Sequence, residues 1–184
     1  KKFNTALYVL KRIKNISNKE TAKIAYHALM ETHLRYGVVV WGGTSALNLK
    51  RVLTIKKSAV RCLTNLDHRG SCRPVFKHLT IKTVTAIYIH KLILLVDKLG
   101  LPREIRLHNH NTRSSFIIPP VRHRTALHER KPTSLGAHLF NQLPANYRHM
   151  TGKELKRKLY AWLTEYPVYT IQEFTEELQF QQRY

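Results

Sequence analysis

The sequence has 184 residues, of which 32 are Lys or Arg and 11 are Asp or Glu, so its formal net charge is +21. A domain needs only a few net charges to stay dispersed, and a larger excess costs stability through self-repulsion. The excess predicts a polyanionic partner, with nucleic acid favoured over anionic membrane. No apolar run approaches the ~20 residues of a transmembrane helix, because His90 and Lys91 interrupt the longest candidate, residues 87–96.

Helices are predicted along the first third of the sequence. Apolar residues at helical spacing predict a helix over residues 5–13. Ser17 and Glu20 have the spacing of a capping box, in which two side chains satisfy the free amides of a first helical turn. We therefore expect a second helix over residues 19–35.

The next segment combines extended and helical patterns. After Gly37, the run Val38 to Trp41 fits a short buried strand, although it is short enough to be one helical turn. Thr44 or Ser45 can cap the helix that follows. The apolar face of that helix consists of Leu49, Val52, Leu53, Ala59, Val60 and Leu63.

The second half contains helices and a basic connector. We expect a polar loop over residues 65–74 and helical structure over 75–98, ended by Gly100 and Pro102. Residues 103–135 are rich in Arg, His, Ser, Pro and Thr, which indicates an extended connector with at most one short strand. A helix is expected over 152–165, stopped by Pro167, and a short helical turn from Thr170 onward. Two cysteines, Cys62 and Cys72, are expected to be reduced thiols.

Little in the sequence supports catalysis. Two-metal phosphoryl transfer needs carboxylates that lie close together, but the two aspartates, Asp67 and Asp97, are thirty residues apart. His108 and His110 could bind a metal on a strand and support a small nuclease, although polar loop histidines are the favoured interpretation. Cys62 and Cys72 do not have a zinc-site spacing.

Basic side chains are concentrated in two segments. One lies on the helix around residues 50–61, where Lys50, Lys57 and Arg61 share one side and no acidic residue occurs between Glu31 and Asp67. The other lies in the connector. The predicted nucleic-acid-binding residues are Lys50, Arg51, Lys56, Lys57, Arg61, Arg113, Arg122, Arg124, Arg130 and Lys131. Such contacts would hold phosphates without selecting a base sequence.

Several stretches resemble the segment that follows the palm in reverse transcriptases of non-LTR retrotransposons, with jockey-like elements the most similar type. The resemblance rests on sequences spread in order along the chain. They are residues 26–29, 33–42, 56–61, 76–79 with Ile81, 110–113, 140–144 and 169–174. The sequence departs from the family pattern at Lys56, where Gln is common, and at Leu155, where Phe is common.

The resemblance implies the thumb and C-terminal region of an RNA-directed DNA polymerase. The fold expected is mainly α, with a thumb-like helical bundle, a basic loop-rich connector and a C-terminal helix. Its segments are 1–66 (thumb-like), 67–102 (helical continuation), 103–145 (connector) and 146–184 (C-terminal helices). The resemblance implies a segment of a longer chain whose palm lies upstream.

The implied partners are RNA, DNA and that palm, in an intracellular ribonucleoprotein of the nucleus and cytoplasm, without a membrane or a small-molecule substrate. No cofactor is expected in this segment, since Mg would belong to the palm. We therefore expect a region that binds nucleic acid and does not polymerise by itself. The alternative is a stand-alone basic module, domesticated or decayed, that binds RNA or an acidic protein scaffold.

Overall fold

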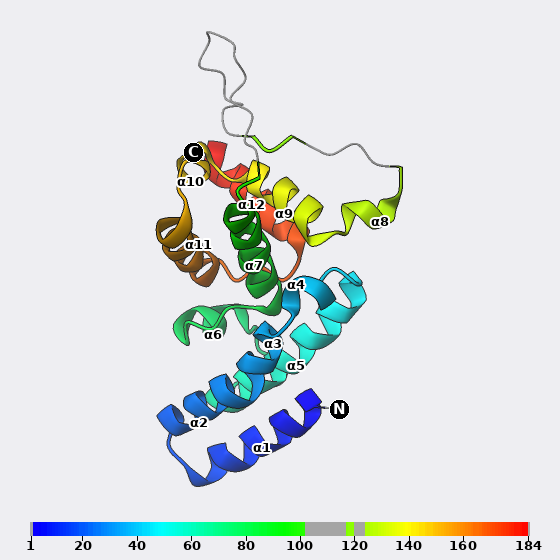
Figure 1. Cartoon of the computed structure of the whole chain (residues 1–184). Helices are drawn as coiled ribbons and strands as arrows, with labels where there is room; N and C mark the ends of the chain where they lie inside the picture. The colour runs from blue at the N-terminus through cyan, green and yellow to red at the C-terminus, as the bar shows by residue number, and fades with distance from the viewer. Residues whose placement is uncertain (1, 102–116, 120–123, 184) are drawn as a thin grey trace.

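Helices make up the regular structure of the part of the chain that the computed structural model describes, residues 2–101, 117–119 and 124–183 (Figure 1). These residues contain no β-strand, so the mainly helical fold expected from the sequence is confirmed. The elements are α1 (Lys2–Ile16), α2 (Lys19–Tyr26), a π-helical segment η1 (His27–Glu31), α3 (Thr32–Arg35), α4 (Val38–Trp41), α5 (Ala46–Thr64), α6 (Arg73–His78), α7 (Val84–Leu99), α8 (Ala126–Glu129), α9 (Pro132–Gln142), α10 (Ala145–Arg148), α11 (Gly152–Glu165) and α12 (Ile171–Arg183). No helix among these residues is long and apolar enough to cross a membrane.

Helices α1, α2 and α5 form one end of the molecule (Figure 1). Their shared core holds buried apolar residues from all three helices, together with Phe76 and Ile81. The helix expected over residues 19–35 is present as α2, η1 and α3, with one π turn inside it. The capping-box prediction was wrong, because Asn18 accepts the Thr21 amide at 2.8 Å while the Ser17 hydroxyl donates to the Ile13 carbonyl. Asn18 is the N-cap, one residue later than expected.

Residues 38–41 are helical, not extended. Gly37 adopts a left-handed conformation (φ 60°), and α4 starts directly after it. The Trp41 indole donates to the Tyr36 carbonyl at 3.0 Å, and Val38 is buried. Tertiary packing therefore outweighs the β preference of this run of valines. Ser45 then caps α5 by accepting the Asn48 amide, as expected from the sequence.

The helical stretch expected over residues 75–98 is split in two. Helix α6 ends at His78, and Thr80 turns the chain with a positive φ of 57°. Thr83 then caps α7 by accepting the Ala86 amide at 3.1 Å. Helix α7 ends at Gly100 in the left-handed conformation, at the position expected from the sequence.

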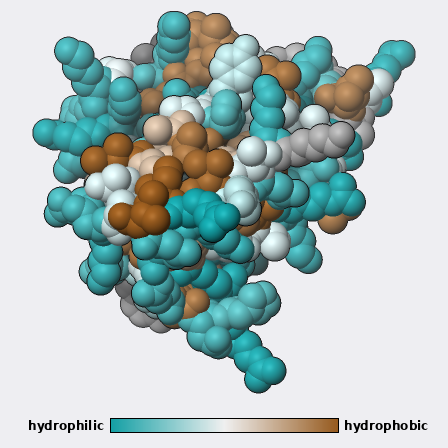
Figure 2. All heavy atoms as spheres, turned by 90° about the horizontal axis from the view of Figure 1, so that it is seen from below, coloured by the Kyte–Doolittle hydropathy of each residue, from teal (hydrophilic) through white to brown (hydrophobic). Residues whose placement is uncertain are grey.

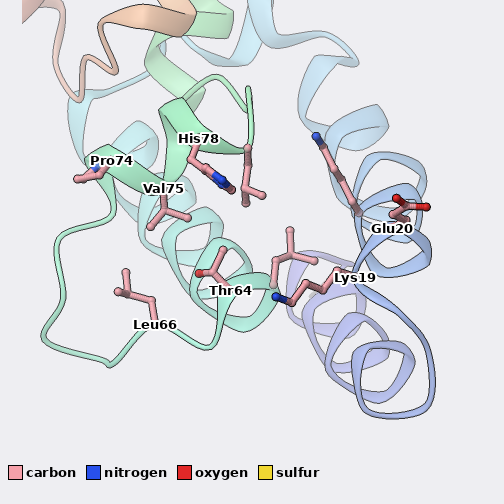
Figure 3. Close-up of a pocket in the computed structure, with 10 residues that line it drawn as sticks. Lys19, Glu20, Thr64, Leu66, Pro74, Val75 and His78 are labelled. Atoms are coloured by element: carbon pink, nitrogen blue, oxygen red, sulfur yellow. The ribbon is translucent and has the colours of Figure 1, made fainter.

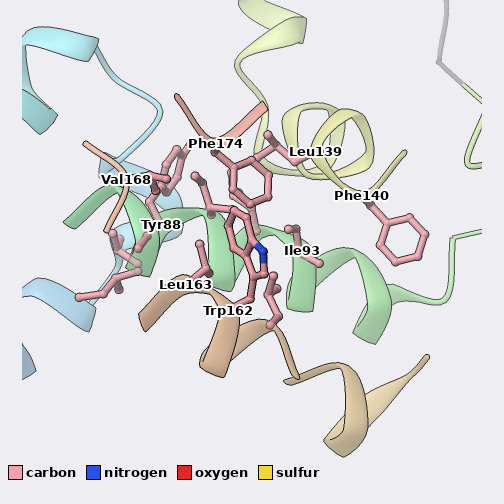
Figure 4. Close-up of a cluster of buried hydrophobic side chains, with 14 of the residues drawn as sticks. Tyr88, Ile93, Leu139, Phe140, Trp162, Leu163, Val168 and Phe174 are labelled. Carbon is pink, nitrogen blue, oxygen red and sulfur yellow. The ribbon is translucent and has the colours of Figure 1, made fainter. Parts of the chain in front are cut away.

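Helix α7 is the central element, packed against α4, α5, α9 and α11. Its residues from Val84 to His90 are all buried. Figure 4 shows Ile93 on α7 facing Trp162 of α11, with Leu139 and Phe174 completing the cluster. Gly136 of α9 allows the close approach to α7, since a Cβ there would lie 2.7 Å from a Val96 methyl group.

The C-terminal third is more helical than the sequence indicated. Helices α8 and α9 lie within the segment assigned to the connector. Asn141 of α9 clasps the chain before them: its side chain accepts the Ile118 amide at 2.9 Å and donates to the Ile118 carbonyl at 2.8 Å. Helix α11 has the bounds that the sequence predicted, whereas α12 is a full helix and not a short turn.

Candidate nucleic-acid interface

The basic residues of α5 do not form one continuous exposed row. Lys50 and Arg51 are exposed near its N-terminus. Lys57 and Arg61 are half-buried, and Lys56 is fully buried. The structure therefore divides the predicted basic helix face into an exposed N-terminal pair and a partly covered C-terminal pair.

Lys56 is a correction to the predicted set of phosphate contacts. Its side chain has no exposed surface, and its ammonium has no hydrogen-bond partner among the residues that the structure describes. Burial lowers its pKa to about 7, although the nearby Glu31 carboxylate acts in the opposite direction. The Tyr26 ring centroid lies 5.9 Å from Nζ. A side chain in this position is enclosed in the core and cannot reach a phosphate on the surface.

A second lysine is buried beside the first. Lys82, just before α7, is 2% exposed, and its ammonium lies 3.7 Å from the centre of the Tyr160 ring. Burial lowers its pKa to about 7. Glu31 lies beside these lysines. Burial alone would raise the pKa of its carboxyl group, but the positive charges of Lys56, Arg35 and His27 have the larger combined effect, and the pKa is lowered. Glu31 therefore remains ionised, with Arg35 bound at 2.6 Å.

Lys57 and Arg73 converge on the ring of Tyr169. The Lys57 ammonium lies 3.7 Å from the ring centroid, and the Arg73 guanidinium lies 4.3 Å from it. Glu173 neutralises part of this charge through an ion pair with Arg73 at 3.0 Å. Burial raises the pKa of Tyr169 to about 12. Lys57 is thus held by an aromatic side chain from the C-terminal region, which limits its freedom to bind a phosphate.

Arg61 lines a hollow between α1 and α5 that has a strongly positive lining. Its guanidinium donates to the Gly70 carbonyl at 3.1 Å, which orients it. The hollow measures about 460 Å³ and has no carboxylate among its lining residues. Its lining consists of Lys11, Lys14, Asn15, Ser58, Arg61, Cys62, Asn65, Leu66 and His68. We call this the α1–α5 basic hollow; its cations and neutral hydrogen-bonding groups suit a phosphate.

The sequence analysis did not identify the contribution of α1 to this hollow. Lys11 and Lys14 belong to a separate helix, and only the packing of α1 on α5 brings them beside Arg61. Both ammonium groups act to lower the pKa of the Cys62 thiol, against the dominant effect of burial, which raises it. The Lys14 ammonium also donates to the Asn65 side chain. No periodicity within α5 could have revealed these neighbours.

The predicted basic residues of the connector are only partly described. Arg124, Arg130 and Lys131 are exposed, near α8 and the start of α9. Arg113 and Arg122 lie outside the described residues, as do His108 and His110. Binding of nucleic acid by the connector therefore stays a prediction from the sequence.

Helix α11 carries a further basic surface that the sequence analysis did not select. Its exposed cations are Lys153, Lys156, Arg157 and Lys158. The apolar residues of the same helix face α7, so the cations necessarily face outward. Glu154 is also exposed on this helix, so its outer surface has mixed sign.

The acidic, histidine and cysteine side chains of the described residues are spread through the fold. The described residues contain no cluster of three His, Cys, Asp or Glu side chains that could hold a metal ion. Asp97 accepts the Gly152 amide at 2.8 Å, and Asp67 accepts the Arg69 amide in a turn. Asp97 therefore links α7 to the start of α11, whereas Asp67 stabilises a local turn, and Cys62 and Cys72 are free thiols.

A second hollow lies between α2, α5 and α6 (Figure 3). It measures about 620 Å³, and Leu63, Leu66, Val75 and Leu79 contribute its apolar lining. The lining also contains Lys19, Lys23 and His78, together with one carboxylate, that of Glu20. In Figure 3 the Lys19 side chain extends toward the hollow while the Glu20 carboxylate points away from it. Figure 2, from the end that carries α1 and α2, shows apolar residues gathered near the centre of a largely hydrophilic surface, with smaller apolar areas toward its edge.

Comparisons with known proteins identify no relative. No family model, no curated protein and no solved structure matches the chain.

Proposed function

We propose that this chain is a nucleic-acid-binding module that holds RNA or an RNA–DNA duplex through phosphate contacts. The observation that carries the proposal is the α1–α5 basic hollow, where Lys11, Lys14, Arg61 and His68 meet without a carboxylate. Neutralising phosphates there releases condensed counterions, which drives binding without reading the bases.

The exposed cations of α5 extend this surface. Eleven residues separate Lys50 from Arg61, and at 1.5 Å per helical residue they lie roughly 16 Å apart along the axis. That length covers several successive phosphates of a strand, which are spaced about 3.4 Å apart along the helix axis. A nucleic-acid backbone that follows α5 would therefore contact Lys50 and Arg51 at one end and the α1–α5 basic hollow at the other.

We further propose that the module is the thumb and C-terminal region of a non-LTR retrotransposon reverse transcriptase. This assignment rests on the sequence resemblance over residues 26–29, 33–42, 56–61, 76–79 with Ile81, 110–113, 140–144 and 169–174. The helical fold and the basic α5 suit a thumb, which lies along the duplex backbone. Only two aspartates occur in the sequence, so polymerisation would depend on an upstream palm with its own Mg ions.

Salt-dependent binding tests the phosphate grip. The probes are a fluorescein-labelled 20-base-pair duplex and a 20-nucleotide single-stranded RNA. If about six phosphates are neutralised, a plot of log binding constant against log salt concentration should have a slope near −5 on the duplex. Replacing Lys11 and Lys14 with Ala removes two cations of the hollow and should reduce the magnitude of that slope by about 2.

The matched control replaces Lys153 and Arg157 of α11 with Ala, which removes the same charge from a different surface. We expect this variant to keep the wild-type slope. A flat slope for the wild type refutes nucleic-acid binding. Equal losses for the two variants refute the α1–α5 basic hollow as its location.

The second hollow favours another function, binding of an acidic protein segment. Its apolar lining can receive apolar side chains, and Lys19, Lys23 and His78 complement carboxylates beside them. A peptide helix with Leu at positions i, i+3, i+4 and i+7 and Glu elsewhere is the probe for calorimetry. Val75→Asp should abolish its binding, whereas Val40→Asp on the exposed side of α4 should not. No heat of binding to the wild type at either of two temperatures, such as about 10 and 35 °C, excludes this function, because apolar burial changes the heat capacity.

A further inference from the structure

Helix α1 displays an aromatic ring beside the α1–α5 basic hollow. The Tyr8 side chain is 59% exposed. Tyr8, Lys11, Arg12 and Asn15 are all exposed and follow the i, i+3, i+4, i+7 spacing of one helix face. Lys11 and Asn15 also line the hollow. Tyr8 therefore lies one helical turn from Lys11, beside the site proposed for a phosphate.

Arg12 orients this ring. Its guanidinium lies 5.6 Å from the ring centroid, and its Nε donates to the Tyr8 hydroxyl at 3.2 Å. An exposed tyrosine contributes little to the stability of the fold. The Tyr8 ring is nevertheless held in place by the Arg12 guanidinium. An ordered and exposed ring next to cations is the arrangement with which proteins bind unpaired nucleotides.

We infer that α1 binds single-stranded nucleic acid, with one unpaired base stacked on Tyr8 and a neighbouring phosphate in the α1–α5 basic hollow. The inference rests on the proposed nucleic-acid binding and adds a preference for unpaired strands. A duplex keeps its bases stacked inside the helix, so it offers the ring no base face. The ring contributes to single-strand binding only, whereas Lys11, Lys14 and Arg61 bind the phosphates of both forms.

Tyr8→Ala tests the inference on the complete chain. The probes are a 12-nucleotide single-stranded RNA, an abasic strand with the same number of phosphates, and a 12-base-pair duplex, all measured by fluorescence anisotropy. We expect Tyr8→Ala to weaken single-stranded RNA binding about five- to tenfold, a typical lower range for loss of one stacked base. Affinity for the abasic strand and the duplex should be unchanged.

Two variants separate stacking from other effects of the substitution. Tyr8→Phe keeps the ring and should retain single-strand affinity within about twofold of the wild type. Tyr36→Ala removes a ring that is 84% exposed elsewhere and should have no effect. The salt slope should be the same for Tyr8→Ala and the wild type, because no charge is removed.

The possible failures are distinguishable. Equal losses of Tyr8→Ala on the RNA, the abasic strand and the duplex, or a reduced salt slope, overturn base stacking and assign the effect to Arg12 or to the fold. Unchanged single-strand affinity of Tyr8→Ala overturns it as well. These outcomes leave the phosphate grip intact, whereas a flat wild-type salt slope removes the proposed function itself.

Discussion

Replacing the buried Lys56 with Met should stabilise the protein at neutral pH. Met fills a similar volume without a charge, and Glu31 retains Arg35 and His27 as partners. The pKa of Lys56 falls from 10.5 to about 7 in the folded protein. At 1.36 kcal/mol per pKa unit, this corresponds to about 5 kcal/mol. Allowing about 1.5 kcal/mol for imperfect packing of the new side chain, we expect a gain of about 3 kcal/mol at pH 7.

The gain should depend on pH in a defined direction. Between about pH 7 and 10.5 the unfolded chain binds more protons at Lys56 than the folded chain, so wild-type stability rises with pH through this window. Below pH 7 both states are protonated and the full cost of burial remains. At pH 9.5 the remaining cost is about 1.4 kcal/mol, so Lys56→Met should then be nearly as stable as the wild type.

Urea unfolding followed by circular dichroism at pH 7, 8.5 and 9.5 measures these differences. The control is Lys50→Met, an exposed lysine on the same helix whose replacement should leave stability and its pH dependence almost unchanged. If Lys56→Met is less stable than the wild type at pH 7, or if its advantage persists at pH 9.5, the reasoning is refuted. The first of these outcomes would show that the ammonium is a stabilising partner of Glu31.

Four further substitutions test the packing and the caps. Asn18→Ala should lower the free energy of unfolding by about 1 kcal/mol in thermal denaturation, whereas Ser17→Ala should cost less, because only Asn18 accepts an amide of α2. Gly136→Ala should cost about 1–3 kcal/mol in urea unfolding, since the new Cβ would lie 2.7 Å from a side chain of α7. Asn141→Ala should lower the free energy of unfolding by about 1–3 kcal/mol, because the Ile118 amide and carbonyl lose their partner. It should also speed proteolysis near Ile118. Cleavage at the wild-type rate would contradict this role of Asn141.

The sequence predicted elements whose signals are local. The apolar spacing of residues 152–165 and the caps at Ser45 and Gly100 depend only on neighbours along the chain, and the structure confirms them. The strand considered for Val38 to Trp41 was wrong, because tertiary packing decides the conformation of this segment. The left-handed Gly37 and the burial of Val38 against the core favour a helical turn.

The candidate site was less predictable than the fold for the same reason. Helical periodicity placed Lys56 near the polar boundary of its helix, but its depth is set by Tyr26 and Glu31 from other segments. Lys11 joins Arg61 only through the packing of α1 on α5. Lys57 is covered by Tyr169, which lies more than a hundred residues further along the sequence. Charge in a sequence predicts a kind of partner, but its location depends on tertiary contacts.

The central position of α7 has a consequence for synthesis on the ribosome. The hydroxyl groups of Thr83 and Thr85 donate to the carbonyls of Val168 and Tyr169, and α11 covers one side of the helix. These partners are translated roughly 70 residues after α7 ends, which takes about 4–14 s at typical elongation rates. The sides of α7 that α9 and α11 cover in the finished protein therefore emerge before these partners are made. During that interval α7 can pack on α4 and α5, but its remaining apolar surface stays open to chaperones until the C-terminal third is made.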